Sequence, residues 1–143
     1  MSAANITESD ILAMVRSGTD PSWRASASGY FALFTADPTD TASLTNECSD
    51  ATYARVAATK ATAWSGGGTS ARANAAQINW PTLTGSGSPL SYWAWVSSAS
   101  GATDYMVSGS LTTPVPWSAG VKPVAGQARA LWPMQFGRQS HGH

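Results

Sequence analysis

The residue types that most often perform chemistry in proteins are scarce in this chain. His141 and His143 are the only histidines, and they lie at the extreme C-terminus, where a side chain is rarely held in the geometry that acid–base catalysis needs. Two imidazoles can bind a divalent metal ion, but a frayed terminus is the more ordinary interpretation. We therefore expect no catalytic triad, no metal site and no cofactor.

Four carboxylates lie in or beside one predicted loop. Paired carboxylates can hydrolyse glycosidic bonds, and clusters of them can hold calcium. Their spacing here matches neither an EF-hand loop nor a known acid–base signature. We predict that they act as turn residues and backbone caps: Asp37, Asp40, Glu47 and Asp50.

Two further features could in principle take part in binding or catalysis, but the sequence signal for each is weak. The run from Gly66 to Ser70 resembles a phosphate loop only superficially, because it lacks a lysine and no helix pattern follows. It is expected to be a loop tip. Cys48 is the only cysteine, which excludes a disulfide framework within the chain and any Cys-x-x-Cys metal site. It is expected to be a buried thiol.

Seven tryptophans are many for 143 residues, and exposed tryptophans can stack on saccharides. Trp93 and Trp95 share one face of a predicted strand because side chains alternate along a strand. Together with Trp117 they are the candidates for a carbohydrate platform. If both faces of that strand are covered, these rings belong to the core or to a protein interface, and this alternative is favoured.

The composition narrows the class of protein. The chain has the length of one domain and a net charge of zero, and only 11% of its residues are charged. Eight cations spread along the sequence do not make the basic face that nucleic-acid binding needs. Nucleic acid is therefore not an expected partner. Half of the residues are Ala, Ser, Thr or Gly, which disfavours long helices. No apolar run approaches membrane-spanning length and the start lacks a signal pattern, so a membrane is not an expected partner either.

The predicted elements are one helix followed by short strands. Residues 5–18 form the helix, in which Thr7 can cap the start and Gly18 suits the end. Ile11, Leu12, Met14 and Val15 form an apolar stripe of helical spacing, which is expected to serve docking or core packing. The predicted strands cover residues 29–35, 51–57, 75–80, 91–97, 104–111 and 122–132. A short turn is expected to join 91–97 and 104–111 as an antiparallel hairpin. This order predicts a mainly β fold, an antiparallel β-sandwich or jelly roll with one short N-terminal helix. We divide the chain into an arm (1–28), a β domain (29–132) and a tail (133–143).

Several short sequence segments resemble those of small virion proteins of tailed bacteriophages. These proteins are of the capsid cement or decoration type that is often labelled tail fibre. The segments lie between residues 29 and 131 and include Tyr30–Pro38, Asn46–Glu47, Tyr53–Val56, Tyr92–Val96 and Ser108–Pro114. The sequence departs from that family at Cys48, in its tryptophan content and in the tail segment 131–136.

The resemblance implies a non-enzymatic capsid cement protein. Such a protein would be made in the cytoplasm of a host bacterium and would bind the exterior of the virion capsid. Its partners would be the major capsid protein and copies of itself, as a dimer or a trimer. The alternative is a tail-fibre, baseplate or head-fibre module that binds a host surface glycan.

The candidate contact residues lie in the terminal segments, outside the predicted sandwich. Aromatic residues, Met and Arg are enriched in the cores of protein interfaces. On this basis, and against the equal alternative of ordinary packing within the domain, the predicted interface residues are Ile11, Met14, Val15, Trp23, Trp132, Met134, Phe136 and Arg138.

Overall fold

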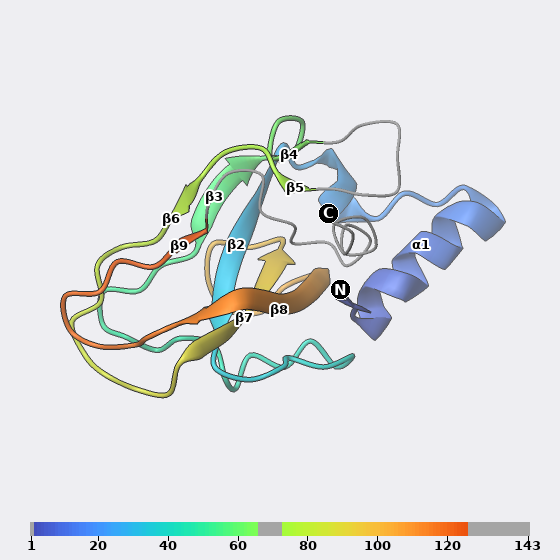
Figure 1. Ribbon diagram of the computed structural model, residues 1–143. Coiled ribbons are helices and arrows are strands. Elements are labelled where there is room, and N and C mark those ends of the chain that lie inside the picture. The colour runs from blue at the N-terminus through green and yellow to red at the C-terminus, as the bar shows by residue number, and fades with distance from the viewer. Residues whose placement is uncertain (1, 66–72, 126–143) are drawn as a thin grey trace, which may run out of the picture.

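The computed structural model describes residues 2–65 and 73–125 and shows a β body with one helix beside it (Figure 1). The helices are α1 (Asn5–Ser17) and the 3-10 helix η1 (Ser22–Ala25). The strands are β1 (Ser2–Ala3), β2 (Ser28–Phe34), β3 (Val56–Thr59), β4 (Trp64–Ser65), β5 (Ala73–Asn74), β6 (Ile78–Asn79), β7 (Leu90–Val96), β8 (Met106–Val115) and β9 (Val124–Ala125).

The main sheet has five antiparallel strands in the order β1-β8-β7-β2-β3. Its centre is formed by the apolar strands β2 and β7, which pair from Tyr30 with Val96 to Phe34 with Tyr92. The predicted hairpin of residues 91–111 is confirmed as β7 and β8, which pair from Val96 with Met106 onward. Beyond Ser110 the register shifts, and β8 bulges away from β7.

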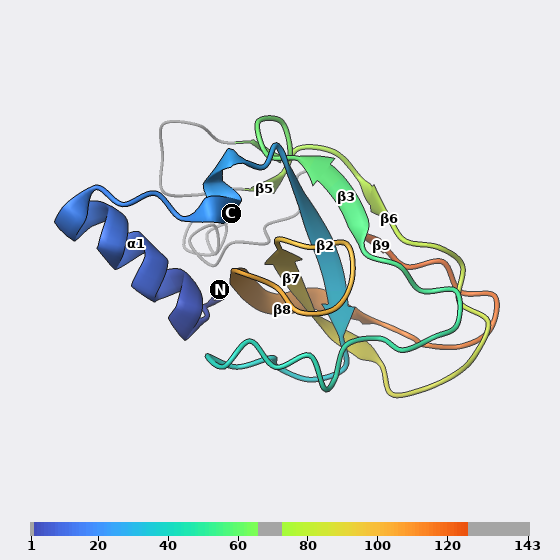
Figure 2. The same ribbon diagram turned by 180° about the vertical axis from the view of Figure 1, so that it is seen from behind.

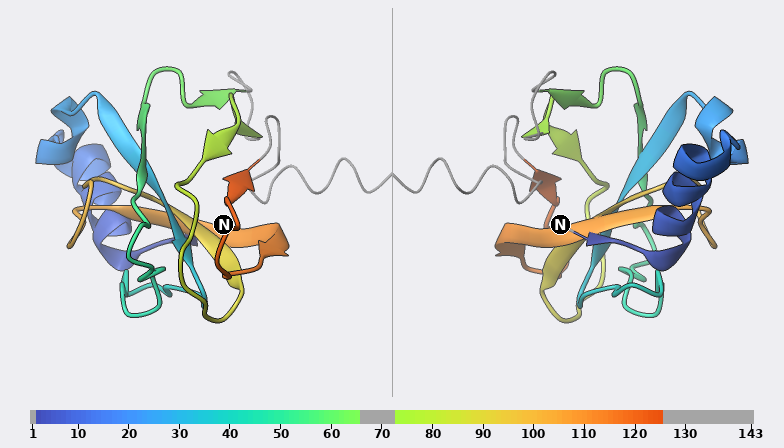
Figure 3. Two further views of the ribbon diagram at one scale, coloured as in Figure 1. Left: turned by 90° about the vertical axis from the view of Figure 1, so that its left-hand side faces the viewer. Right: turned by 90° about the vertical axis from the view of Figure 1, so that its right-hand side faces the viewer.

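Two small sheets, β4-β5 and β6-β9, complete the described strands. Figure 3 shows them on one side of the main sheet, with α1 on the other side of the body. The mainly β, antiparallel prediction with one N-terminal helix is confirmed. A closed sandwich or jelly roll is not formed by the described residues, because the strands facing the main sheet are only two residues long.

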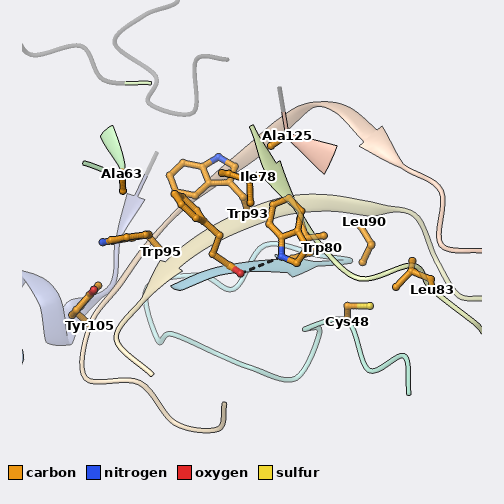
Figure 4. Close-up of a cluster of buried hydrophobic side chains, with 12 residues drawn as sticks. Cys48, Ala63, Ile78, Trp80, Leu83, Leu90, Trp93, Trp95, Tyr105 and Ala125 are labelled. Atoms are coloured by element: carbon orange, nitrogen blue, oxygen red, sulfur yellow. Dashed lines mark hydrogen bonds between the residues drawn. The ribbon is translucent and has the colours of Figure 1, made fainter. Parts of the chain in front are cut away.

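Aromatic side chains fill the space between the main sheet and these small sheets. Figure 4 shows Trp80, Trp93 and Trp95 together in this cluster, and the Trp80 indole N–H donates a 3.1 Å hydrogen bond to the carbonyl of Phe31. On the other face of the sheet a smaller cluster surrounds Phe34 and Met106. Both faces of β7 are therefore covered, which explains why this strand is an almost continuous apolar run.

Three strand predictions fail in part. Residues 51–55 form turns and loop, and the strand begins at Val56, just after Arg55, which is only 8% exposed. Of the predicted strand 75–80 only Ile78 and Asn79 pair, and of 122–132 only Val124 and Ala125 do so within the described residues. For residues 51–55 and 75–77 local alternation suggested a longer strand than the available partners extend, whereas residues 126–132 lie outside the described residues.

Helix α1 ends as predicted but begins differently. Gly18 adopts a left-handed conformation with φ of 69° and donates its N–H to Met14, a conformation that glycine tolerates well. At the start Ala4 is the cap residue and no side chain caps the helix, so the prediction for Thr7 is wrong. Thr7 is buried inside the first turn and bonds to β8 instead.

Candidate functional site

The apolar stripe predicted on α1 is largely exposed. Of the large aliphatic side chains there, Ile11 is 43% exposed, Leu12 57% and Val15 78%, and Met14 is half-buried. Figure 2 shows that the helix stands beside the sheet and projects away from it. We call Ile11, Leu12 and Val15 the α1 patch. Ordinary packing against the domain, the alternative considered for this stripe, does not cover these three side chains within the described residues.

The first turn of α1 is fixed firmly to the sheet. Thr7 Oγ1 donates to the carbonyl of Met106 at 3.1 Å and accepts from the Met106 N–H at 2.8 Å. The Ala4 N–H donates to the same carbonyl at 2.9 Å. The bonds between α1 and β8 are therefore confined to the start of the helix, whereas the α1 patch lies further along it.

A second attachment comes from Trp23 in η1. Its indole N–H donates to the Asp10 carboxylate at 2.7 Å, and its ring lies 4.8 Å from that of Tyr105. The Lys60 ammonium bonds to the Trp23 carbonyl and sits 5.5 Å from both ring centres. Burial raises the pKa of Tyr105 to about 12, so it is uncharged at neutral pH. Trp23, a predicted interface residue, thus makes several contacts within the domain.

Trp93 and Trp95 cannot serve as an exposed sugar platform in this fold, because they are 1% and 8% exposed. The ring centroids of Trp95 and Phe31 lie 4.6 Å apart. The Trp95 ring also lies directly on Gly29, where a Cβ atom would come within 2.2 Å of the ring. Gly109 makes the same kind of room for Trp93. These two rings are core, as the two-face argument favoured.

Trp117 is half-buried and is the one member of the predicted glycan set with accessible surface. Its indole N–H donates to Asp50 Oδ1 at 3.0 Å. Gly87 lies against the ring, where a Cβ atom would come within 2.4 Å. One side of the ring is therefore occupied, which leaves at most a small stacking surface.

Asp50 joins three loops. Besides Trp117, it accepts bonds from the backbone and hydroxyl of Thr52, from those of Thr84, and from the Gly85 N–H. The Trp117 bond, followed by the backbone and hydroxyl bonds, holds the pKa of Asp50 far below its usual range. The prediction of a cap is confirmed for this residue. Both carboxylate oxygens are engaged in these bonds.

Glu47 forms a buried ion pair with Arg55. The Arg55 Nε lies 2.8 Å from Glu47 Oε2, and its other nitrogens donate to the carbonyls of Ser98 and Gly101. Burial disfavours the charged form of Arg55 and by itself would lower its pKa. The bonds to Glu47 outweigh this effect, so the pKa of Arg55 is raised. Burial, with Glu47 nearby, also raises the pKa of Tyr53, which donates to the same carboxylate. A pocket of 320 Å³ is lined by this ion pair and also by Cys48. Cys48 is a buried thiol, as predicted.

The remaining candidates are less constrained. Asp37 accepts a 2.9 Å bond from the Thr39 N–H, as predicted for a turn residue.

Among residues 2–65 and 73–125 no cluster of three His, Cys, Asp or Glu residues could hold a metal ion. In the same ranges no helix has the length and hydrophobicity to cross a bilayer. Outside the described residues lie the glycine run and the tail candidates Trp132, Met134, Phe136 and Arg138, together with His141 and His143.

Sequence reasoning missed two features of this surface. It placed Leu12 in the helical stripe but not among the interface candidates, although Leu12 is more exposed than Ile11. It also missed the joining of distant loops by Asp50 and by Glu47 with Arg55. Leu12 could have been found from the helical period, whereas the loop contacts join residues up to 67 positions apart and leave no local signal.

Comparison with known families identifies the chain. No curated protein matches it. A family model described as podophage GP4 fiber I protein gp80 matches residues 2–124. This match confirms the resemblance to tailed-phage virion proteins, and it is to a fibre protein, not to a decoration protein. The matched segment covers every described strand except the last residue of β9, and the chain therefore belongs to the Gp80 family of podophage fibre proteins.

Proposed function

We propose that the chain is a non-enzymatic fibre subunit that attaches to another virion protein through the α1 patch. The observation that carries the proposal is the exposure of Ile11, Leu12 and Val15 on a helix that projects from the body. Aliphatic side chains grouped on an unpartnered face mark protein contacts in soluble proteins. The acidic side chains of the loops are engaged in structural bonds, which agrees with a role in binding.

Virion incorporation of α1 variants tests this proposal. A phage lacking the gene is complemented with full-length Val15→Glu or Leu12→Glu, and the chain is quantified in purified virions. We expect strong loss of incorporation, because a carboxylate would be buried without a partner in the contact. The matched control is Val124→Glu, which places the same charge on an exposed valine of β9. Equal incorporation of all variants would reject the α1 patch as the attachment surface.

A capsid decoration role, with the major capsid protein as the partner, is what the resemblance mainly implied, and a fibre role was its alternative. The α1 patch suits that contact as well, but the matched family is a fibre family. Copy number separates the two roles. A fibre subunit is expected in tens of copies per virion, and a shell-wide cement protein in hundreds. Loss of the chain should abolish adsorption in the first case, and should reduce the heat resistance of the head in the second.

Glycan binding is a second candidate function, supported by the fibre family and carried by Trp117 alone. Its test is binding of purified host envelope polysaccharide to the full chain and to Trp117→Ala. The Asp50→Asn variant is the control, because it loosens the same loops but keeps the indole ring. Loss of binding only in Trp117→Ala would support stacking on this ring. Equal loss in both variants, or no binding by the wild-type chain, would remove the candidate.

A further inference from the structure

An apolar groove of about 260 Å³ lies between β3 and β6. Its lining includes Phe31, Val56, Ala58, Ala63 and Ile78, so its floor is continuous with the aromatic core. Residues 56–59 of β3 and residue 78 of β6 both line this groove. The two strands are not paired, since β3 is an edge of the main sheet and β6 pairs only with β9 among the described strands.

The groove is bordered by two strands whose outer backbone groups point away from their paired neighbours. Lys60 donates its N–H to Ala27, so residues 60, 58 and 56 face β2, and Ala57 directs its N–H and carbonyl away from the main sheet. On the other side Trp80 donates to Pro123. By the same alternation Gln77 and Asn79 direct their backbone groups away from β9. No backbone partner for these outward groups is found among the described residues.

This combination of an apolar floor and two open strand edges is the arrangement that accepts an added β-strand. Backbone hydrogen bonds to such an edge give affinity, and alternate side chains of the added strand enter the groove. An occupant must therefore be extended and must carry apolar side chains at every second position.

The chain's own tail has this pattern. Trp132, Met134 and Phe136 alternate with Pro133 and Gln135, so in a strand the three apolar side chains share one face. The backbone groups of Pro133 then point opposite to those of residues 132 and 134. Proline is tolerated in an added strand only where its missing N–H faces away from the neighbouring strand.

The exit point of the chain favours this occupant. The last described residue, Ala125, pairs with Ile78, and Ile78 lines the groove. Trp132 follows seven residues later and can reach about 23 Å from Ala125 at about 3.3 Å per residue. Because the tail is covalently attached, its effective concentration at the groove exceeds that of a separate molecule.

We propose that residues 131–136 add as a β-strand to the groove between β3 and β6 of the same chain. The added strand would join the main sheet to the β6-β9 pair and would place Trp132, Met134 and Phe136 over the half-buried Val56 and Ala58. In this arrangement the tail aromatics stabilise the fold, and the contacts with other virion proteins fall to α1. The inference does not depend on the proposed function.

Disulfide trapping in the full chain tests the proposal. The variant Gln77→Cys/Met134→Cys is oxidised mildly, and its mass and mobility are compared before and after reduction. Cys48 stays in place because it is buried and burial raises its pKa. We expect an intramolecular disulfide in a monomer. The control pairs Met134→Cys with Thr112→Cys, at an exposed position of β8 that does not line the groove, and should form the bond much more slowly.

The other outcomes contradict the proposal. A disulfide-linked dimer would assign the groove to the tail of a second copy, and equal trapping in the control would show a chance encounter. If neither engineered cysteine pair forms a disulfide, the tail does not reach the groove. In a second measurement Trp132→Ala should lower the Tm of the full chain and Trp132→Phe should restore most of it. Identical Tm values for all three proteins would also overturn the proposal.

Discussion

Strand β7 and helix α1 both carry large apolar side chains, but they use them differently. In β7 Leu90, Trp93 and Val96 are at most 1% exposed, while in α1 Leu12 and Val15 are more than half exposed. The strand lies between two neighbours and has both faces covered, whereas the helix is bonded to β8 only through its first turn. The comparison teaches that apolar residues determine the fold where partners surround them, and remain available for binding where they do not.

The largest effect is expected in the aromatic core. Trp80→Ala removes a side chain that is 2% exposed and also the bond to the Phe31 carbonyl. A buried Trp or Phe truncated to Ala costs about 3–5 kcal/mol of unfolding free energy, because a cavity remains. Urea unfolding measures this loss. A loss below about 1 kcal/mol would show that the cluster is much less tightly packed than the structure indicates.

Breaking the buried ion pair should have the next largest effect. Arg55→Met leaves the Glu47 carboxylate without its cation in a site where the Arg55 side chain is 2% exposed and that of Glu47 15%. We expect a loss of about 3 kcal/mol in unfolding free energy. The double variant Glu47→Gln/Arg55→Met should recover part of it, since no charge is then left unpaired. A double variant less stable than the single one would contradict this explanation.

The pH dependence of stability should depend on Asp50. Its pKa is lowered in the folded state by the Trp117 bond and the surrounding donors, so the carboxylate stabilises the fold above its unfolded pKa of about 3.9. This contribution is lost as the pH falls towards the folded pKa. Asp50→Asn should therefore be less stable at pH 7 and should lose less stability on acidification than the wild-type chain. Unfolding by urea at neutral and acid pH measures both effects.

The control for that experiment is Asp37→Asn, which removes the charge of an exposed carboxylate and should leave the unfolding free energy at pH 7 nearly unchanged. If wild-type and Asp50→Asn proteins lost stability equally on acidification, the dominant acid-sensitive group would lie elsewhere.

The smallest effect on stability is expected in the α1 patch. Val15→Ser removes an aliphatic group that is 78% exposed, so its unfolding free energy should change by no more than about 0.5 kcal/mol. Differential scanning calorimetry of the wild-type and variant chains measures this. A much larger loss would mean that Val15 packs against the body, and the contrast between α1 and β7 would then disappear.

The sequence predicts the parts of the fold that have local signals. The apolar runs of β2 and β7, the turn between β7 and β8, and the glycine that ends α1 are all found in place. The short strands β6 and β9 are less predictable, because their lengths depend on partners more than 40 residues away. Thr7 has the residue type of a helix cap, but Ala4 starts the helix earlier, and the Thr7 hydroxyl bonds to Met106.

The candidate site follows the same division. Helical spacing predicted the α1 stripe, and the argument from two covered faces favoured a core position for Trp93 and Trp95. Which of the apolar side chains stay exposed depends on where the helix is attached, and this is decided by tertiary contacts such as the one between Asp10 and Trp23.

The environment of α1 in the assembled virion tests the central claim most directly. A cryo-EM reconstruction of the virion at side-chain resolution would show it. We predict density for the chain at a fibre, with Ile11, Leu12 and Val15 covered by another polypeptide. An α1 patch facing solvent throughout the virion, or copies of the chain spread over the head shell, would contradict the account.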